Sequence, residues 1–284
     1  MLVVDETQSD MRALIKSDFG ALDPAKDFLV SFLDWLHFRA RRIPRKSRDV
    51  VASSEIQSKR DGFPAVDAIT REFRSGGDLG PWLSDSVRRQ MTDHKADLMF
   101  NDWGISHFHL GRMFLNPRKV KRSSDLLFAY VEIDHVVLLD IQPHGSWSLH
   151  SLLEILLRTH PADMTRYELK GVMGSGSNRT ADDVLKLRKA GASTYYEVNG
   201  RLFMPDLGIS TSGHSTKIVR FTQNLLRQIK NLRQMIERNE LPAYFMLQVA
   251  GTLPLAIKLG VRLEANEFVI HDKNRRIDFM RLPF

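Results

Sequence analysis

The sequence predicts an α+β protein that has a helical N-terminal region, small antiparallel sheets with packed helices, and a long amphipathic helix near the C-terminus. Apolar residues recur at helical spacing in the first hundred residues, alternate as in strands from residue 101, and return to helical spacing over about 214–238. We therefore expect a helical region over 1–97 and an α+β domain over 98–284. The histidine-rich part of that domain, 101–150, is the candidate active region.

Three helices are expected in the N-terminal region. Asp23 can cap the first of them, Pro24 suits its first turn, and Pro44 ends the apolar pattern that follows. The polar and basic stretch 45–62 predicts a loop or linker after this helix. The expected helices cover residues 24–42, 64–74 and 85–94.

The spacing changes to that of strands after residue 101. Side chains alternate over 103–110, which predicts a strand. Asp125–Val131 and Val136–Gln142 are rich in β-forming residues and flank a short acidic turn, so they predict an antiparallel hairpin. The later expected elements are helices over 147–158, 181–190 and 214–238, a hairpin around Asn199-Gly200, and a final hairpin around Lys273-Asn274.

Composition narrows the classes of function. The 284 residues contain 41 lysines and arginines against 34 acidic residues, a net charge of +7 that favours a polyanionic partner. The absence of cysteine excludes disulfides, thiolate metal sites, iron–sulfur clusters and a cysteine nucleophile. No apolar run approaches the roughly 20 residues that span a bilayer, and the acidic start lacks the pattern of a secretion signal. We therefore expect a cytoplasmic protein that does not bind membranes.

Lysine and arginine are also clustered along the chain. One cluster lies at the end of the first expected helix and in the loop after it, and the other precedes the expected hairpin over 125–142. Such clusters neutralise several phosphates together, and their binding depends steeply on salt. A solvated helix end is the alternative for the first cluster. The candidate nucleic-acid-binding residues are Arg41, Arg42, Arg45, Lys46, Arg118, Lys119 and Lys121.

Seven of the ten histidines lie between His94 and His160. In the expected strand, His107 and His109 project from one face about 7 Å apart, while the residues between and after them face the core. Two imidazoles on one face suit acid–base cleavage of a phosphodiester, and they equally suit metal ligation. Solvent-facing histidines with no chemical role are the remaining alternative.

Other polar residues gather near the expected hairpin. His144 follows its second strand, where functional groups are common, and Asp140 on that strand is placed to orient an imidazole. Arg122 can stabilise a pentacovalent phosphate, and Tyr130 can stack on a base. The expected catalytic residues are His107, His109, His144, Arg122 and Tyr130, with His107 or His109 as base, His144 as acid and no cofactor. The alternative metal ligands are His107, His109, Asp140 and His144.

The segment from Arg122 to His144, with its basic approach from residue 118, resembles the central β-hairpin of RelE/ParE-type toxins. In that family a basic approach leads into a strand, a tight acidic turn and a second apolar strand that ends at a functional residue. The resemblance implies a small antiparallel sheet packed by helices, metal-independent mRNA cleavage and an inhibitory protein partner. It covers under a tenth of the chain and places Arg122, Tyr130 and His144 at comparable positions.

Three functions therefore remain open from the sequence. The first is a metal-independent endoribonuclease of toxin or defence type, for which RNA is preferred to DNA. The second is a non-catalytic nucleic-acid-binding or regulatory protein. The third is a metal-dependent phosphodiesterase that uses the His-x-His pair. The apolar stripe of the expected helix over 214–238 is either a core face or the seam of a homodimer.

Overall fold

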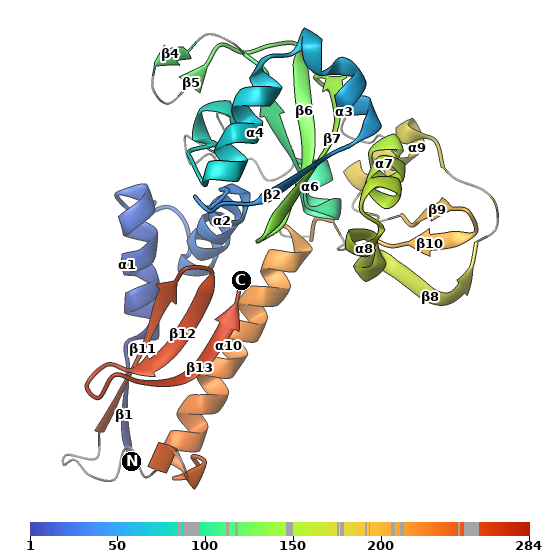
Figure 1. Ribbon diagram of the computed structural model, residues 1–284. Helices are drawn as coiled ribbons and strands as arrows, with labels where there is room; N and C mark the ends of the chain where they lie inside the picture. The colour runs from blue at the N-terminus through green and yellow to red at the C-terminus, as the bar shows by residue number, and fades with distance from the viewer. Residues whose placement is uncertain are drawn as a thin grey trace. The chain divides into compact units, whose positions relative to one another are not determined.

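The chain folds into two compact units, and each is described by itself (Figure 1). The computed structural model describes all residues except 85, 86, 88–96, 112, 113, 117, 118, 146–149, 175, 177, 178, 191, 193, 206, 207, 211, 212, 244 and 247–255. The first unit contains Met1–Leu36 and Ile218–Phe284, and the second contains His37–Lys217. The α+β class expected from the sequence is confirmed.

The first unit is built from both ends of the chain. Its four-stranded sheet has the order β1-β11-β12-β13, in which β1 is parallel to β11 and the other pairs are antiparallel. This division differs from the boundary expected between residues 97 and 98, because β1 pairs with a strand more than 250 positions later. The elements are β1 (Leu2–Asp5), α1 (Thr7–Phe19), α2 (Phe28–Arg41), α10 (Thr216–Glu237), β11 (Ala256–Glu264), β12 (Glu267–Asp272) and β13 (Ile277–Pro283), of which α2 and α10 cross the unit boundaries.

Aromatic side chains form the centre of the first unit. Phe268 on β12 lies 6.1 Å from Trp35 of α2 and 5.4 Å from Phe221 of α10, measured between ring centroids. The apolar stripe of α10, which includes Leu225 and Ile236, is buried. The stripe is therefore a core face, and the final expected hairpin is present as β12 and β13.

The second unit contains a four-stranded sheet of order β2-β7-β6-β3. The expected hairpin is present as β6 and β7, and the expected strand is present as β3, antiparallel to β6. The expectation of a loop over 45–62 was wrong, because this stretch forms β2, parallel to β7, and the helix α3. The strand β2 was missed because its two valines are too short an apolar run to indicate a strand. The helix α3 begins after Ser53, whose hydroxyl caps it by accepting a hydrogen bond from the Ile56 amide. The elements are β2 (Asp49–Ala52), α3 (Ser54–Lys59), β3 (Ile105–His109), β6 (Asp125–Val131) and β7 (His135–Pro143).

Helices cover both faces of this sheet (Figure 1). On one face α4 (Ala65–Ser75), which matches the expected second helix, packs its buried Phe73 against Phe108 of β3. Residues from α6, α7 and α8 pack against Ile105 and its neighbours on the other face. These helices are α6 (Leu98–Trp103), α7 (Ser151–Thr159) and α8 (Pro161–Met164).

The rest of the second unit consists of short elements. A three-stranded sheet of order β8-β10-β9 contains the expected turn, in which Asn199 and Gly200 both have positive φ as a type I′ turn requires. Thr180 and Asp183 form the expected capping box. The expected helix over 85–94 lies almost wholly outside the described residues. The further elements are β4 (Phe114–Asn116), β5 (Lys119–Val120), β8 (Glu168–Met173), α9 (Ala181–Lys189), β9 (Tyr196–Val198) and β10 (Arg201–Phe203), with short 3-10 turns at Arg60–Gly62, Gly80–Trp82 and Thr165–Tyr167.

Candidate functional site

Three histidines gather at one end of the β2-β7-β6-β3 sheet, and we name His107, His109 and His144 the histidine cluster. The ring centroids of His107 and His109 are 6.2 Å apart, and those of His109 and His144 are 6.4 Å apart. The strand register explains this meeting. His109 at the end of β3 lies opposite Leu126 near the start of β6, and the His144 amide donates to the Ser124 carbonyl at 2.8 Å just beyond β7.

The cluster runs from the surface into the interior. His144 and Arg122 are exposed, whereas His107 and His109 retain only 9% and 4% of their accessible surface. The Arg122 guanidinium contacts Nε2 of His109. The alternative of solvent-facing strand histidines is therefore wrong for His107 and His109, because the second face of the sheet is covered as well as the first. The expected core positions of Phe108 and Leu110 are confirmed.

A buried ion pair lies beneath the cluster. Oδ2 of Asp97 is 3.6 Å from Nδ1 of His107 and 3.3 Å from Nη2 of Arg41, and all three side chains are at least nine-tenths buried. Asp97 also caps α6 by accepting from the Phe100 amide. Arg41 was expected to bind phosphate at the surface, and the structure instead places it inside, where a buried carboxylate requires a cationic partner.

Burial lowers the pKa of His107, because a desolvated imidazolium is unfavourable. Asp97 opposes this effect, and the electrostatic influence of Arg41, His144 and Arg122 reinforces it. His107 is therefore neutral at neutral pH and a weaker base than an exposed imidazole.

Asp140 lies outside the histidine cluster. Its carboxylate accepts from Lys59 Nζ at 2.7 Å, from Gln142 Nε2 at 2.5 Å and from the Ile141 amide at 2.7 Å. None of these partners is an imidazole, so Asp140 does not have the orienting role expected for it. Among the described residues, the side chains close enough to share one metal ion include neither Asp140 nor a member of the histidine cluster, so the alternative set of metal ligands does not come together.

Tyr130 is placed in the core rather than at the site. Its ring is 1% exposed, stands opposite Ile105 in the β3–β6 pairing, and has the Arg166 guanidinium 5.3 Å from its centroid. Burial, then Tyr167 and the hydrogen bond that the hydroxyl donates to Glu132, raise the pKa of Tyr130. The expectation of an aromatic platform for a base was wrong, because the helices on the second face enclose this ring.

The other candidate nucleic-acid-binding residues are mostly at the surface. Arg42, Lys46 and Lys121 are exposed and Lys119 is half-buried. Arg45 is exposed and pairs with Asp78 at 2.6 Å, so part of its charge is already compensated. Arg118 lies outside the described residues.

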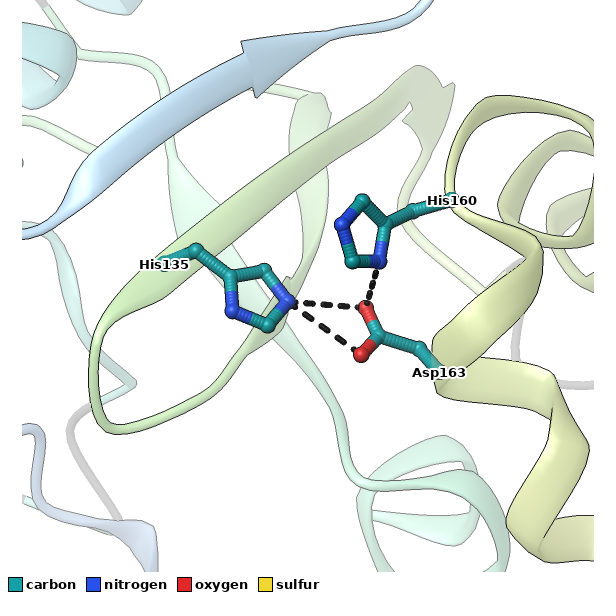
Figure 2. A group of neighbouring side chains, drawn as sticks. All are labelled: His135, His160 and Asp163. Carbon is teal, nitrogen blue, oxygen red and sulfur yellow. Dashed lines mark hydrogen bonds and ion pairs between the residues drawn. The ribbon is translucent and has the colours of Figure 1, made fainter.

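Sequence reasoning missed two features of the second unit. It passed over Asp97, whose only local signal is its position as a helix cap. It also missed a second group, formed by His135, His160 and Asp163 (Figure 2). Its local signal is the pattern His160-x-x-Asp163, in which His160 precedes α8 and Asp163 lies within it, and the third member, His135, is 25 positions before His160.

No protein-family model matches the chain, and neither a curated protein nor a solved structure matches it. Among the residues that the structure describes, no helix has the length and apolar character that crossing a membrane requires.

Proposed function

We propose that the protein is a metal-independent endoribonuclease whose reaction centre is the histidine cluster together with Arg122. One observation carries the proposal: three imidazoles and a guanidinium from separate segments meet at one end of a rigid sheet. The exposed His144 and Arg122 are accessible to a polymer, and the buried imidazoles behind them are held by packing. His107 and His109 lie on a packed strand, which keeps their geometry better than a loop would, and Arg122 and His144 lie in the segments next to β6 and β7.

The chemistry divides between two imidazoles. His109 removes the proton of a ribose 2′-hydroxyl once the exposed Arg122 guanidinium moves from its Nε2 to the phosphate, and the ribose oxygen then forms a bond to phosphorus. His144 gives a proton to the 5′-oxygen as the P–O bond breaks. The two rings are stacked with centroids 6.4 Å apart, and imidazole nitrogens bond in the plane of the ring, so a phosphate must lie at the shared edge of the pair to reach both.

Arg122 and His107 have supporting roles. The Arg122 guanidinium offsets the negative charge that develops on the pentacovalent phosphate. His107 is a positioning residue, because it is buried between His109 and Asp97 and fixes the neighbouring ring by packing. RNA is preferred to DNA because it carries the 2′-hydroxyl that serves as the nucleophile.

The biological setting in this proposal is a toxin or defence nuclease that acts in the cytoplasm and is controlled by an inhibitory protein. The support is the resemblance of the 118–144 segment to the RelE/ParE hairpin and the net charge of +7. Induced expression in a bacterial host should arrest growth, and the His109→Ala/His144→Ala variant should not. Equal growth with both proteins would count against the toxin assignment.

The test of the reaction uses labelled single-stranded RNA and a copy in which every ribose is 2′-deoxy. We expect cleavage of the RNA alone, in EDTA, to products that end in a 2′,3′-cyclic phosphate. The His109→Ala/His144→Ala variant should lose cleavage while its circular dichroism spectrum stays unchanged. Undiminished cleavage by this variant would refute the proposal.

A non-catalytic nucleic-acid-binding protein is the second candidate. The observation that favours it is the exposure of Arg42, Lys46 and Lys121 on a chain with net charge +7. Binding of RNA with a steep salt dependence, but without cleavage under any condition, would select this function over the first.

A further inference from the structure

A second group of histidines in the same unit is organised around a carboxylate (Figure 2). His135 is the first residue of β7, and His160 and Asp163 lie at the start of α8. Nε2 of His135 is 2.9 and 3.2 Å from the two Asp163 oxygens, and Nδ1 of His160 is 2.9 Å from Oδ2. The centroids of the two imidazoles are 4.6 Å apart.

Local sequence places two of these side chains together. Pro161 occupies the first turn of α8, where its fixed φ favours a helical conformation. The N–H that proline lacks has no partner within a helix at this position, so no hydrogen bond is lost. The Asp163 amide donates to the His160 carbonyl at 3.2 Å, which closes a turn and brings the side chains three positions apart to one side. The third side chain comes from the sheet, because His135 pairs with Asp49 of β2 at the beginning of β7.

The distances suit a small metal ion. One ligand atom from each of the three residues lies within 4.8 Å of the other two. Zinc bonds of about 2.0–2.1 Å in a tetrahedron require neighbouring ligand atoms about 3.3 Å apart. The nitrogen–oxygen distances of 2.9 and 3.2 Å need to lengthen by only a few tenths of an ångström to meet this value.

The polar partners of the imidazoles also suit a cation. Nδ1 of His135 is 2.8 Å from Asp134, so this ring has a carboxylate at each nitrogen, whereas a neutral imidazole has only one N–H to donate. Nδ1 of His160 is buried and makes no hydrogen bond among the described residues, although a carboxylate oxygen lies 2.9 Å away. A cation between the rings and Asp163 would satisfy both nitrogens.

We propose that His135 Nε2, His160 Nδ1 and the Asp163 carboxylate bind a divalent transition-metal ion, with Zn²⁺ as the first candidate. Two nitrogens and one carboxylate oxygen match Zn²⁺ and exclude a preference for Mg²⁺ or Ca²⁺, which take oxygen ligands. His135 then donates from Nδ1 to Asp134, the carboxylate–histidine–metal arrangement that orients a ligating ring.

The site has an open side and a structural consequence. His160 is 34% exposed, so water can supply the fourth ligand from solvent. The ion ties the beginning of β7 to α8, and it binds only the folded chain, so it should raise the melting temperature as its concentration rises. None of its ligands belongs to the histidine cluster, so this inference is independent of the proposed function.

The experiment measures Zn²⁺ binding to untagged, EDTA-treated, full-length protein by calorimetry, with Co²⁺ as a spectroscopic probe. We expect one ion per chain and a visible Co²⁺ spectrum of tetrahedral intensity. His160→Gln and Asp163→Asn should each weaken binding more than 100-fold. Asp134→Asn, which removes only the orienting carboxylate, should weaken it about 10- to 100-fold.

His144→Gln is the matched control, because it removes an exposed imidazole from the other group in the same unit. Binding that is lost in His144→Gln and kept in His160→Gln would move the ion to the histidine cluster and overturn the proposal. Absence of stoichiometric Zn²⁺ binding would also overturn it. X-ray absorption of the wild-type complex tests the ligand set without any variant, since it must show two imidazoles and no sulfur.

Discussion

The second unit contains two groups of histidines in opposite electrostatic settings. The histidine cluster has Arg122 in contact with His109, and the one carboxylate near its rings, Asp97, is already paired with Arg41. In the second group, by contrast, Asp163 lies between His135 and His160. Histidine side chains thus face a cationic neighbour, which favours an anionic ligand, in the histidine cluster. In the group of His135 and His160 they face a carboxylate, which favours a cationic ligand.

The pKa directions of the buried His107 and the half-buried His135 express the same contrast. Burial lowers the pKa of His107, and nearby arginines add to the effect. Burial opposes the charged form of His135 too, but hydrogen bonds to Asp163 and Asp134 outweigh it and raise the pKa. His107 therefore stays neutral at neutral pH, whereas the carboxylates beside His135 favour the protonated form of its ring.

The largest expected effect is on catalysis. His144→Ala removes the proposed acid and should lower kcat for RNA about 10²- to 10⁴-fold with little change in KM. His160→Gln, an equally local change in the other group, should leave kcat unchanged. Single-turnover cleavage in EDTA measures both, and equal losses in the two variants would break the comparison between the groups.

The next effect is on stability. Asp97→Asn keeps a good helix cap but removes the buried charge that faces Arg41, so it should lower the free energy of unfolding by about 3–5 kcal/mol. The exposed pair of Arg45 and Asp78 gives the control, because Asp78→Asn should cost at most about 1 kcal/mol. Urea unfolding measures both values. Equally small losses of unfolding free energy in both variants would mean that the ion pair of Asp97 and Arg41 does not stabilise the structure beneath the histidine cluster.

A smaller loss is expected at Arg122, whose charge distinguishes the histidine cluster from the acidic group. Arg122→Gln should lower kcat about 10²- to 10³-fold, the usual cost of losing one donor to the transition state. Arg122→Lys should restore part of this loss. If the glutamine variant keeps full kcat and only its KM rises, the guanidinium binds RNA without stabilising the reaction.

The smallest effect concerns pH. The pKa of His107 is lowered below its unfolded value of 6.5, so below that pH the unfolded chain binds a proton that the folded chain does not. Stability from this group is complete above about pH 6.5 and falls as the pH drops toward the folded pKa, by at most about 1.4 kcal/mol per pH unit. The free energy of unfolding, measured with urea at pH 7.5 and at pH 5.5, should differ less between the two pH values in His107→Gln than in the unsubstituted protein. An equal difference in both proteins would contradict the assignment.

Turns, hairpins and helices that depend on neighbouring residues were predictable from the sequence. The Asn199-Gly200 turn, the β6–β7 hairpin and α4 each depend on residues within a short stretch, and each is present. The meeting of His107, His109 and His144 also followed, because a hairpin and one adjacent strand bring them to the same end of the sheet.

Long-range packing was not predictable. The two-residue period of β6 does not reveal that helices cover both faces of its sheet, so Tyr130 was expected at the site although it lies in the core. The pairing of Arg41 with Asp97 joins residues 56 positions apart, and that of His135 with Asp163 joins residues 28 apart. These contacts depend on how whole elements pack, which residue spacing does not encode.

The parallel pairing of β1 with β11 has a consequence for the time course of synthesis. The ribosome makes β1 long before its partner β11, which begins only at Ala256. At about 5–20 residues per second, β1 waits on the order of 10–50 s, while the whole of the second unit is completed between the two strands. A strand that is made well before its partner is therefore among the last to pair.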